Sequence, residues 1–563
     1  MCGMRDEVKN VWKISPWRKV LMLTACFVGG TLYAAALPPL NWSFAVMVSL
    51  VPVLYCAGKS SWKFSALCGW VWGVGWALFA YQFLREIECF VPYLLAPVIA
   101  LWSAVWAALL PGIYRFALVP RPLATANCAE RGAYLKNALP QWRILLAAVV
   151  SAAAFTMIEW SRSRLFVWND FSVTQWRNTT LIQIAALTGS YGIGFLLALI
   201  NTAVYSAVAY RKKAVAAVVL TLVVTGSALL YGSWRVKSLE TLPPPDTVVR
   251  AGLIQCDLTQ RRSASPQEIY EAVDVCTSLS EKCAALKPEF IIWPESAVPI
   301  PLQSGGAEGD YFRRKFAAML RETKLPFLAG MLAFKQSAVS DEWKITNSAV
   351  LFTPEGRAVA RYDKIHRVPY GEYVPFRKYL PEFIINAVNM GRDLEPGVNF
   401  DPVQLKPNVN ASIAICYEGV FGYLMREFAG RGADLFITIS NDAWYPRSSE
   451  PEQHLANAAI RCVETGLFMI RCGNNGGSGV VTPLGKFTQY IGSRADRPEL
   501  LRERAYGVVE VPVYAEREAT VFVRCGEYFI VILALILTAF AVYALLYSVN
   551  VNTRMFKLVR REK

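Results

Sequence analysis

A series of long apolar stretches limits what this chain can fold into more than any other feature. From Val20 to about Tyr231, stretches of roughly 16 to 25 residues follow one another, which is the length a helix needs to cross about 30 Å of hydrocarbon. With 54% hydrophobic and only 18% charged residues, the chain is too apolar for an ordinary soluble protein. We therefore expect a membrane α-helical bundle of about eight transmembrane helices, at 20–37, 42–57, 64–84, 91–114, 144–160, 190–209, 214–232 and 528–549.

Basic residues gather in short clusters between these stretches, and the clusters predict the orientation of the chain. The 58 Lys and Arg, against 43 Asp and Glu, concentrate in the N-terminal segment, after the second, fourth and sixth stretches, and in the C-terminal tail. Loops rich in Lys and Arg stay in the cytoplasm. The pattern places both termini in the cytoplasm and the long segment between the seventh and eighth spans outside. It also argues against nucleic acid as a partner, because no single basic face collects these charges.

The segment between the last two spans has the texture of a water-soluble α/β domain. It follows a stiff linker with three consecutive prolines, Pro243 to Pro245. Short β-rich runs such as VVRAGLIQ, EFIIWP, NSAVLFT, ASIAICY and DLFITIS alternate with helical patterns, which predicts a sheet covered by helices. We divide the chain into a membrane domain (1–232), a linker (233–246), an α/β domain (247–526), an eighth transmembrane helix (527–549) and a basic tail (550–563).

Three reactive side chains in the α/β domain lie at predicted strand ends or in the loops that follow. Glu295 comes after IIWP, Lys364 lies in RYDKIHRVPYGEYVP, and Cys416 comes after SIAI. Proteins of this class usually carry their sites there. A cysteine is nucleophilic as its thiolate, and a nearby cation lowers the pKa of the thiol. We expect Lys364 to favour the thiolate and to stabilise an oxyanion, while Glu295 moves the proton.

The blocks around these residues resemble a known superfamily. The order IIWPES, DKIHRVPYGEYVPF, ICYEGVF and ISNDAW resembles the nitrilase superfamily, whose Glu-Lys-Cys triad lies on an αββα sandwich. Together with the membrane half and its ALPPLNW and LIQIAALTGSYGIGF segments, the chain resembles the apolipoprotein N-acyltransferase family. The resemblance implies that Cys416 is the nucleophile, Glu295 the general base and Lys364 the oxyanion partner.

The same resemblance implies supporting residues and a reaction. Glu372 matches an additional glutamate beside the triad, and Tyr417 and Glu418 flank the nucleophile. The implied enzyme transfers a fatty acyl chain from a phospholipid, of phosphatidylethanolamine type, through a cysteine thioester to the α-amine of S-diacylglyceryl cysteine on apolipoproteins. It needs no cofactor and no metal. We expect a monomer in the bacterial inner membrane, with its catalytic domain on the periplasmic side.

Other functions fit parts of the pattern. The triad would also serve a membrane-tethered amidase that acts on a small carbon–nitrogen substrate. A Cys-His hydrolase could use His366 or His454, the two histidines of the chain. A non-enzymatic alternative is an inactive lipoprotein-binding relative or a transporter, although Glu159 is the main intramembrane charge that a transporter could use. For Glu418, a favourable charge at the start of a helix explains the residue equally well.

Aromatic residues and cysteines leave two further questions. The outward segment after the fifth span could form an interfacial platform or merely an anchor, through Trp160, Phe166, Trp168, Phe171 and Trp176. The 13 cysteines include no CxxC pair, which argues against common zinc and iron–sulfur sites, and those in the apolar half are expected to be small buried side chains. Cys276 with Cys283, and Cys462 with Cys472, are candidate disulfides that spacing alone does not decide.

Overall fold

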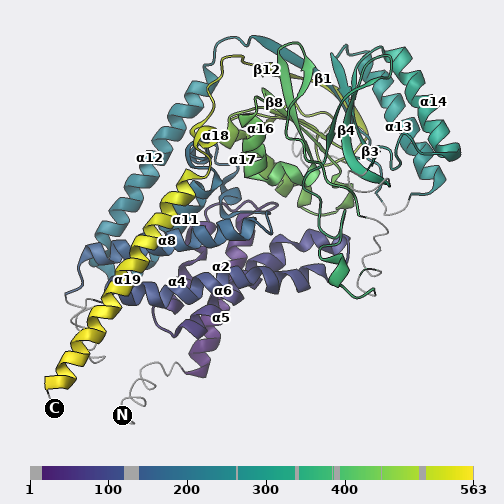
Figure 1. Cartoon of the computed structure of the whole chain (residues 1–563). Coiled ribbons are helices and arrows are strands. Elements are labelled where there is room, and N and C mark those ends of the chain that lie inside the picture. The colour runs from purple at the N-terminus through teal and green to yellow at the C-terminus, as the bar shows by residue number, and fades with distance from the viewer. Residues whose placement is uncertain are drawn as a thin grey trace. The chain divides into compact units, whose positions relative to one another are not determined.

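The computed structural model contains two compact units (Figure 1). The helical unit comprises Met1–Arg235 and Glu527–Lys563, and the sandwich unit comprises Val236–Gly526. The structure describes residues 15–119, 138–260, 264–336, 342–382, 385, 393–445, 447–493 and 502–561. The first three residues of the N-terminal basic cluster, Arg5, Lys9 and Lys13, and most of the loop after the fourth predicted span lie outside the described residues, and the predicted orientation partly rests on them.

Long and short helices account for most of the helical unit. Their bounds are α2 (Pro16–Ala36), α3 (Val46–Ser49), α4 (Val51–Ala57), α5 (Trp62–Ala80), α6 (Val91–Leu118), α8 (Gln141–Ser163), α9 (Thr179–Ile182), α10 (Ala185–Thr188), α11 (Ser190–Tyr210), α12 (Val215–Glu240) and α19 (Tyr528–Arg561). Within the described ranges, five helical stretches are long and apolar enough to cross a membrane: Pro16–Ala36, Val91–Leu118, Gln141–Ser163, Ser190–Glu240 and Tyr528–Tyr547. The fourth stretch contains both α11 and α12, so the predicted count of eight spans stays a prediction.

Several predicted boundaries differ from the structure, including the end of the eighth helix, because α19 continues through the predicted tail to Arg561. The span predicted at 42–57 is interrupted at Leu50, whose backbone N–H donates to the Asn201 side chain at 2.9 Å, and Pro52 follows without an N–H to offer. The linker predicted at 233–246 is helical over its first half, because α12 continues to Glu240. Irregular backbone begins at Thr241, just before the prolines.

The loop after α8 is folded into the unit. Trp168, Phe171 and Trp176 are buried, and the Phe171 ring packs edge-on against Tyr33 and Phe155 with ring centroids 4.9 and 4.8 Å apart. The hypothesis that these three aromatic residues form an exposed interfacial platform is therefore wrong. Burying their large apolar surface inside the unit is more favourable than leaving it at the interface.

A buried cation holds this loop. Arg162 Nη2 lies 3.0 Å from Asp170 Oδ1 and 3.8 Å from Glu159 Oε1, while its Nη1 donates to two backbone carbonyls of the loop. Glu159 also accepts a hydrogen bond from the Phe171 N–H at 2.6 Å. We call Glu159, Arg162 and Asp170 the Arg162 cluster. The members of this cluster bind one another and the loop backbone. These contacts indicate that the charges stabilise the loop, which argues against the transporter alternative.

Two six-stranded sheets form the sandwich unit. The first has the order β12-β1-β2-β3-β4-β5 and the second β11-β10-β9-β8-β7-β6. The bounds are β1 (Thr247–Gln255), β2 (Phe290–Ile292), β3 (Phe327–Gln336), β4 (Trp343–Phe352), β5 (Ala358–Asp363), β6 (Val403–Lys406), β7 (Val409–Ile415), β8 (Leu435–Ser440), β9 (Met469–Gly473), β10 (Gly479–Val481), β11 (Phe487–Thr488) and β12 (Ala505–Val513). Strands β1 to β3 and β7 to β9 run parallel, and the other neighbours are antiparallel.

Helices cover the sheets, as the alternating pattern predicts. They are α13 (Pro266–Ala284), α14 (Gly306–Thr323), α16 (Gly422–Gly430), α17 (Glu450–Thr465) and the short α18 (Val521–Cys525). A capping box of Ser265 and Glu268 starts α13, and Phe312 and Phe316 of α14 pack on Trp293 in the core of the first sheet. Helices α16 and α17 lie beside the second sheet (Figure 1). All the β-rich runs predicted above are strands, whereas β5, β6, β10, β11 and β12 were not anticipated.

The cysteines of the sandwich unit are free thiols. Cys276 lies 3.1 Å from Cys256, sulfur to sulfur, and Cys283 donates to the Gly507 carbonyl at 3.6 Å. Cys462 and Cys472 are both buried and unbonded to each other. Neither candidate disulfide is present, since all four cysteines are free thiols.

Candidate active site

The predicted site residues follow the carboxyl ends of strands. Glu295 lies three residues after β2, Lys364 directly follows β5, and Cys416 directly follows β7. Strands β2 and β5 point the same way, since β3, β4 and β5 pair antiparallel in turn and β2 pairs parallel with β3. Because these two strands run in the same direction, Glu295 and Lys364 lie at the same end of the first sheet.

Lys364 is buried between two carboxylates. Only 1% of its side chain is exposed, and its Nζ lies 3.3 Å from Glu295 Oε1 and 3.1 Å from the Glu372 carboxylate. Burial alone would lower the pKa of Lys364, but the charges of Glu295 and Glu372 outweigh it and raise that pKa well above its ordinary value. Lys364 is thus a buried ammonium group held between two carboxylates.

Asn347 braces this arrangement and was missed by the sequence analysis. Its Nδ2 donates to Glu295 at 2.7 Å and to Glu372 at 2.8 Å, and its backbone carbonyl accepts the backbone N–H of Lys364 at 2.8 Å. The one available signal was a polar residue inside the buried strand run NSAVLFT. We call Glu295, Asn347, Lys364 and Glu372 the Lys364 cluster.

Cys416 occupies a strained position beside this cluster. It opens the 3-10 turn η6 (Cys416–Val420) with φ of 55°, a left-handed conformation that a non-glycine residue rarely adopts. Burial raises the pKa of the Cys416 thiol, the charge of Glu295 raises it further, and Lys364 opposes both without cancelling them. Lys364 lowers the pKa of Cys416, as expected of a nearby cation, but burial and Glu295 keep that pKa well above its ordinary value. A raised pKa favours the protonated thiol, so formation of a thiolate at this position would require a nearby base.

Glu418 connects the Cys416 turn to the Lys364 loop. Its Oε2 accepts the Ile415 N–H at 2.7 Å, and its Oε1 accepts the N–H groups of Ile365 and His366 at 2.7 and 2.9 Å. The Tyr362 hydroxyl donates to the same oxygen at 2.9 Å. Burial raises the pKa of Glu418 to about 7, and these hydrogen bonds oppose the shift. Glu418 lies in the first turn of η6 and accepts the N–H of its N-cap residue, as a favourable charge at a helix start would, and the same carboxylate also binds the backbone of the Lys364 loop.

The neighbouring aromatic residues form a small stack. Tyr417 is half-buried and meets Phe421 edge-on with ring centroids 5.0 Å apart. The His366 ring stacks on Phe421 at 4.5 Å, and its Nε2 is hydrogen-bonded to the Tyr423 hydroxyl. Burial lowers the pKa of His366. The contacts of His366 are thus with Phe421 and Tyr423, which argues against His366 as the base for Cys416.

His454 contacts the backbone of the nucleophile. Its Nε2 donates to the Cys416 carbonyl oxygen at 3.0 Å, and its Nδ1 lies 3.1 Å from Asp442 Oδ1. Asp442 also receives a hydrogen bond from Arg471, and all three side chains are buried. Both ring nitrogens of His454 thus have partners other than the Cys416 sulfur, which argues against the Cys-His hydrolase alternative.

Two stacked sheets with Glu, Lys and Cys at strand ends define the carbon–nitrogen hydrolase class of domain, and the Carbon-nitrogen hydrolase family matches residues 250–495. A second family, Apolipoprotein N-acyltransferase N-terminal domain, matches residues 29–203. The apolipoprotein N-acyltransferase of Geobacter metallireducens is 30% identical over 480 residues, which cover 84% of this chain and 86% of the relative. The chain belongs to the apolipoprotein N-acyltransferase family.

Other relatives agree. The apolipoprotein N-acyltransferase of Allorhizobium ampelinum is 27% identical over 501 residues, covering 86% of this chain and 89% of the relative. Among solved structures, an amidase from Nesterenkonia sp. is 20% identical with a TM-score of 0.31 and covers 49% of this chain and 95% of its own. The predicted family and the predicted nitrilase-like domain are confirmed, and the apolar helices agree with a membrane protein.

Proposed function

We propose that this acyltransferase moves a fatty acyl chain from a membrane phospholipid, through a thioester on Cys416, to the α-amine of an S-diacylglyceryl cysteine on apolipoproteins. The observation that carries the proposal is the Lys364 cluster. It supplies a carboxylate and a fixed ammonium whose charges both act on the Cys416 thiol. The N-terminal family match adds a membrane half to this chemistry.

In the first half-reaction the Cys416 sulfur attacks the acyl carbonyl carbon. The thiol proton passes to Glu295, the S–C bond forms, and the carbonyl oxygen becomes an oxyanion that Lys364 stabilises. The ester C–O bond then breaks, and Glu295 returns the proton to the leaving lysophospholipid oxygen. Glu295 is the base that the raised pKa of Cys416 requires.

In the second half-reaction the lipoprotein amine attacks the thioester. Glu295 takes a proton from the amine, the C–N bond forms, and the Cys416 sulfur leaves and recovers the proton. Covalent capture divides one difficult transfer into two easier ones and predicts ping-pong kinetics. No step requires a cofactor or a metal ion.

Other residues position these groups. Glu372 and Asn347 hold the Lys364 ammonium and the Glu295 carboxylate in register. Glu418 fixes the Lys364 loop to the nucleophile turn, and His454 holds the Cys416 carbonyl. Tyr417, whose ring packs edge-on against Phe421 next to the Cys416 turn, is proposed to support the acyl substrate.

The membrane half suits substrates that carry acyl chains. Lifting such chains into water costs about 0.8 kcal/mol per CH₂, so the reaction is favoured at the bilayer. We place the protein in the bacterial inner membrane as a monomer with about eight spans, both termini cytoplasmic and the sandwich domain periplasmic. A phosphatidylethanolamine-type lipid is the proposed donor.

A transfer assay on the full chain tests the function. Vesicles of phosphatidylethanolamine labelled in the acyl chain are mixed with a diacylglyceryl-cysteine peptide, and the peptide is analysed by mass. We expect label on the peptide α-amine with the wild type and with Cys89→Ser, an exposed thiol in the helical unit, but none with Cys416→Ala. Hydrolysis of small amides without acyl transfer would instead identify a membrane-tethered amidase.

A further inference from the structure

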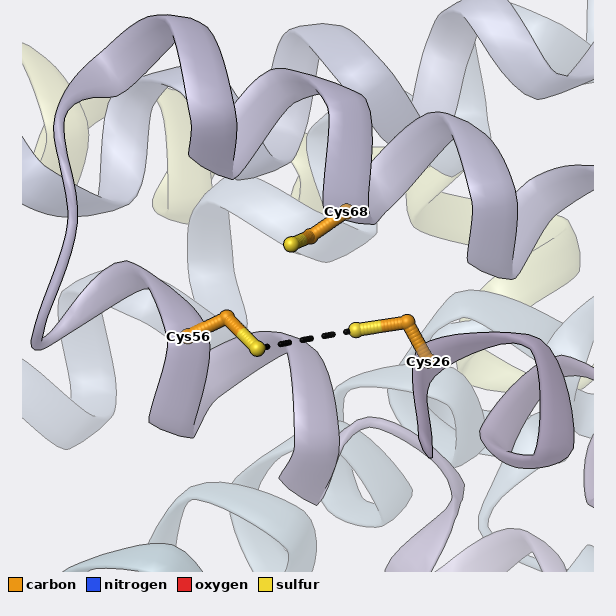
Figure 2. Close-up of side chains that lie close together, drawn as sticks. All are labelled: Cys26, Cys56 and Cys68. Carbon is orange, nitrogen blue, oxygen red and sulfur yellow. Dashed lines mark hydrogen bonds between the residues drawn. The ribbon is translucent and has the colours of Figure 1, made fainter. Parts of the chain in front are cut away.

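Three cysteines from three helices of the helical unit meet at one point. Cys26 belongs to α2, Cys56 to α4 and Cys68 to α5, and all three are buried with at most 1% of each exposed. Their sulfur atoms lie within 4.8 Å of one another, and those of Cys26 and Cys56 are 3.8 Å apart. Figure 2 shows the three thiols pointing toward one another across the space between the helices. We call them the thiol cluster.

The thiols are directed at each other and not at their own helices. Elsewhere in this unit, polar side chains such as Thr156 and Thr221 donate to the carbonyl four residues earlier. The contact found for Cys26 and Cys56 is with each other. Simple packing of small apolar side chains requires no such convergence of sulfur atoms.

Close helix contacts hold the cluster in place. A Cβ on Gly30 of α2 would lie 2.1 Å from the Trp72 carbonyl of α5, and one on Gly29 would lie 2.5 Å from the Ser49 carbonyl of α3. A Cβ on Gly75 would meet the Phe27 carbonyl at 2.6 Å. Glycines at these points let the backbones approach, as in membrane helix pairs generally. The sulfurs are therefore positioned by packed backbone and not by flexible loops.

We propose that the thiol cluster binds a soft monovalent metal ion, Cu(I), in a three-coordinate site. Sulfur ligands select soft ions such as Cu(I). With metal–sulfur bonds of about 2.3 Å, a three-coordinate ion holds its sulfurs about 4 Å apart, which matches the Cys26–Cys56 spacing.

The number of ligands and the surroundings favour Cu(I) over zinc. Structural zinc takes four ligands, whereas the group found among the described residues offers three sulfurs. A single thiolate neutralises Cu(I), so binding replaces at least one S–H bond by an S–Cu bond and releases that proton. Neither copper nor sulfur changes oxidation state. A divalent ion would require two thiolates in the same apolar interior.

The experiment uses the full chain in detergent under anaerobic conditions, titrated with Cu(I) against a competing chelator. We expect one tightly held ion per chain in the wild type, sulfur-to-copper absorption in the near ultraviolet, three sulfur neighbours by X-ray absorption, and a higher thermal midpoint. The triple variant Cys26→Ala, Cys56→Ala, Cys68→Ala should lose all four signals. A control triple variant, Cys89→Ala, Cys462→Ala, Cys472→Ala, should keep them.

The thiol cluster does not include the proposed catalytic groups, so its variants should still transfer acyl chains. Cu(I) binding is therefore compared between proteins that retain acyl transfer. If the triple variant fails to fold, Cys56→Ala alone should lower Cu(I) affinity at least tenfold. Equal Cu(I) binding by the wild type and the cluster variants would overturn the proposal, and so would a copper site with fewer than three sulfur ligands.

Discussion

The Arg162 cluster and the Lys364 cluster place the same charges, one cation between two carboxylates, in buried positions of two different units. One guanidinium nitrogen of Arg162 donates to backbone carbonyls, and one oxygen of Glu159 accepts a backbone N–H. The Arg162 cluster therefore holds a loop in place. Lys364 has its contacts with the side chains of Glu295 and Glu372, and its charge acts on Cys416. Buried ion pairs alone therefore do not identify a reactive site. The candidate reactive site differs in that the cation has no backbone carbonyl partner among the described residues and its charge acts on a cysteine.

The largest effect is expected when the cation of the Lys364 cluster is removed. Lys364→Met should lower the acyl-transfer rate by about a thousandfold, because the oxyanion loses its stabilising charge. Lys335→Met is the matched control, since Lys335 is partly exposed and pairs with Asp363, the residue before Lys364. Transfer rates of the two variants check the prediction, and a Lys364→Met enzyme within tenfold of wild type would contradict it.

The corresponding change in the Arg162 cluster should affect stability and not chemistry. Arg162→Met leaves Glu159 and Asp170 buried without their cation, which costs about 3–5 kcal/mol. We expect a lower thermal midpoint and a lower yield, but a rate per folded molecule within about threefold of wild type. Arg164→Met, at a partly exposed pair with Glu527, should change neither quantity. A folded Arg162→Met protein without activity would erase the distinction between the clusters.

Removing the amide that braces the two carboxylates should have an intermediate effect. Asn347→Leu deprives Glu295 and Glu372 of a donor, and we expect a rate decrease of about tenfold to a hundredfold. Ser412→Ala is the control, because its buried hydroxyl has no hydrogen-bond partner among the described residues. The comparison fails if both variants behave alike in the transfer assay.

His454 should contribute less, through position alone. His454→Ala frees the Cys416 carbonyl, and we expect kcat to fall about tenfold with KM unchanged. His454→Gln, whose amide can still donate to that carbonyl, should recover most of the rate. If His454 were instead the base for Cys416, glutamine would not rescue the enzyme and the thioester would be lost.

The smallest effect concerns the pH dependence of stability. The pKa of Glu418 is about 7 in the folded protein, above its ordinary 4.5, because burial disfavours the charge. A raised carboxyl pKa contributes stability that is complete below the unfolded-state value and is lost as the pH rises through the folded-state value. The thermal midpoint of wild type relative to Glu418→Gln should therefore decline between pH 4.5 and about 7. A difference that grows with pH would show that Glu418 is ionised throughout.

The sequence predicted those parts of the structure that local pattern controls. Apolar length predicted most of the long helices, and the motif blocks predicted Glu295, Lys364 and Cys416 at strand ends. Asn347 could not be predicted, because its contacts with Glu295 and Glu372 depend on sheet register and on the loop after β5. The break at Leu50 depends on Asn201, 151 residues away, and the thiol cluster joins residues of three helices. The resting state of Cys416 could not be inferred either, because its pKa depends on burial as well as on the nearby charges.

The most direct test of the account is the mass of the peptide that contains Cys416 after incubation of the full chain with phosphatidylethanolamine and no acceptor. We expect one fatty acyl group on that peptide, released by hydroxylamine and transferred when a diacylglyceryl peptide is added. An unmodified Cys416 peptide in a preparation that still transfers acyl chains, or an acyl group on any other residue, would contradict it.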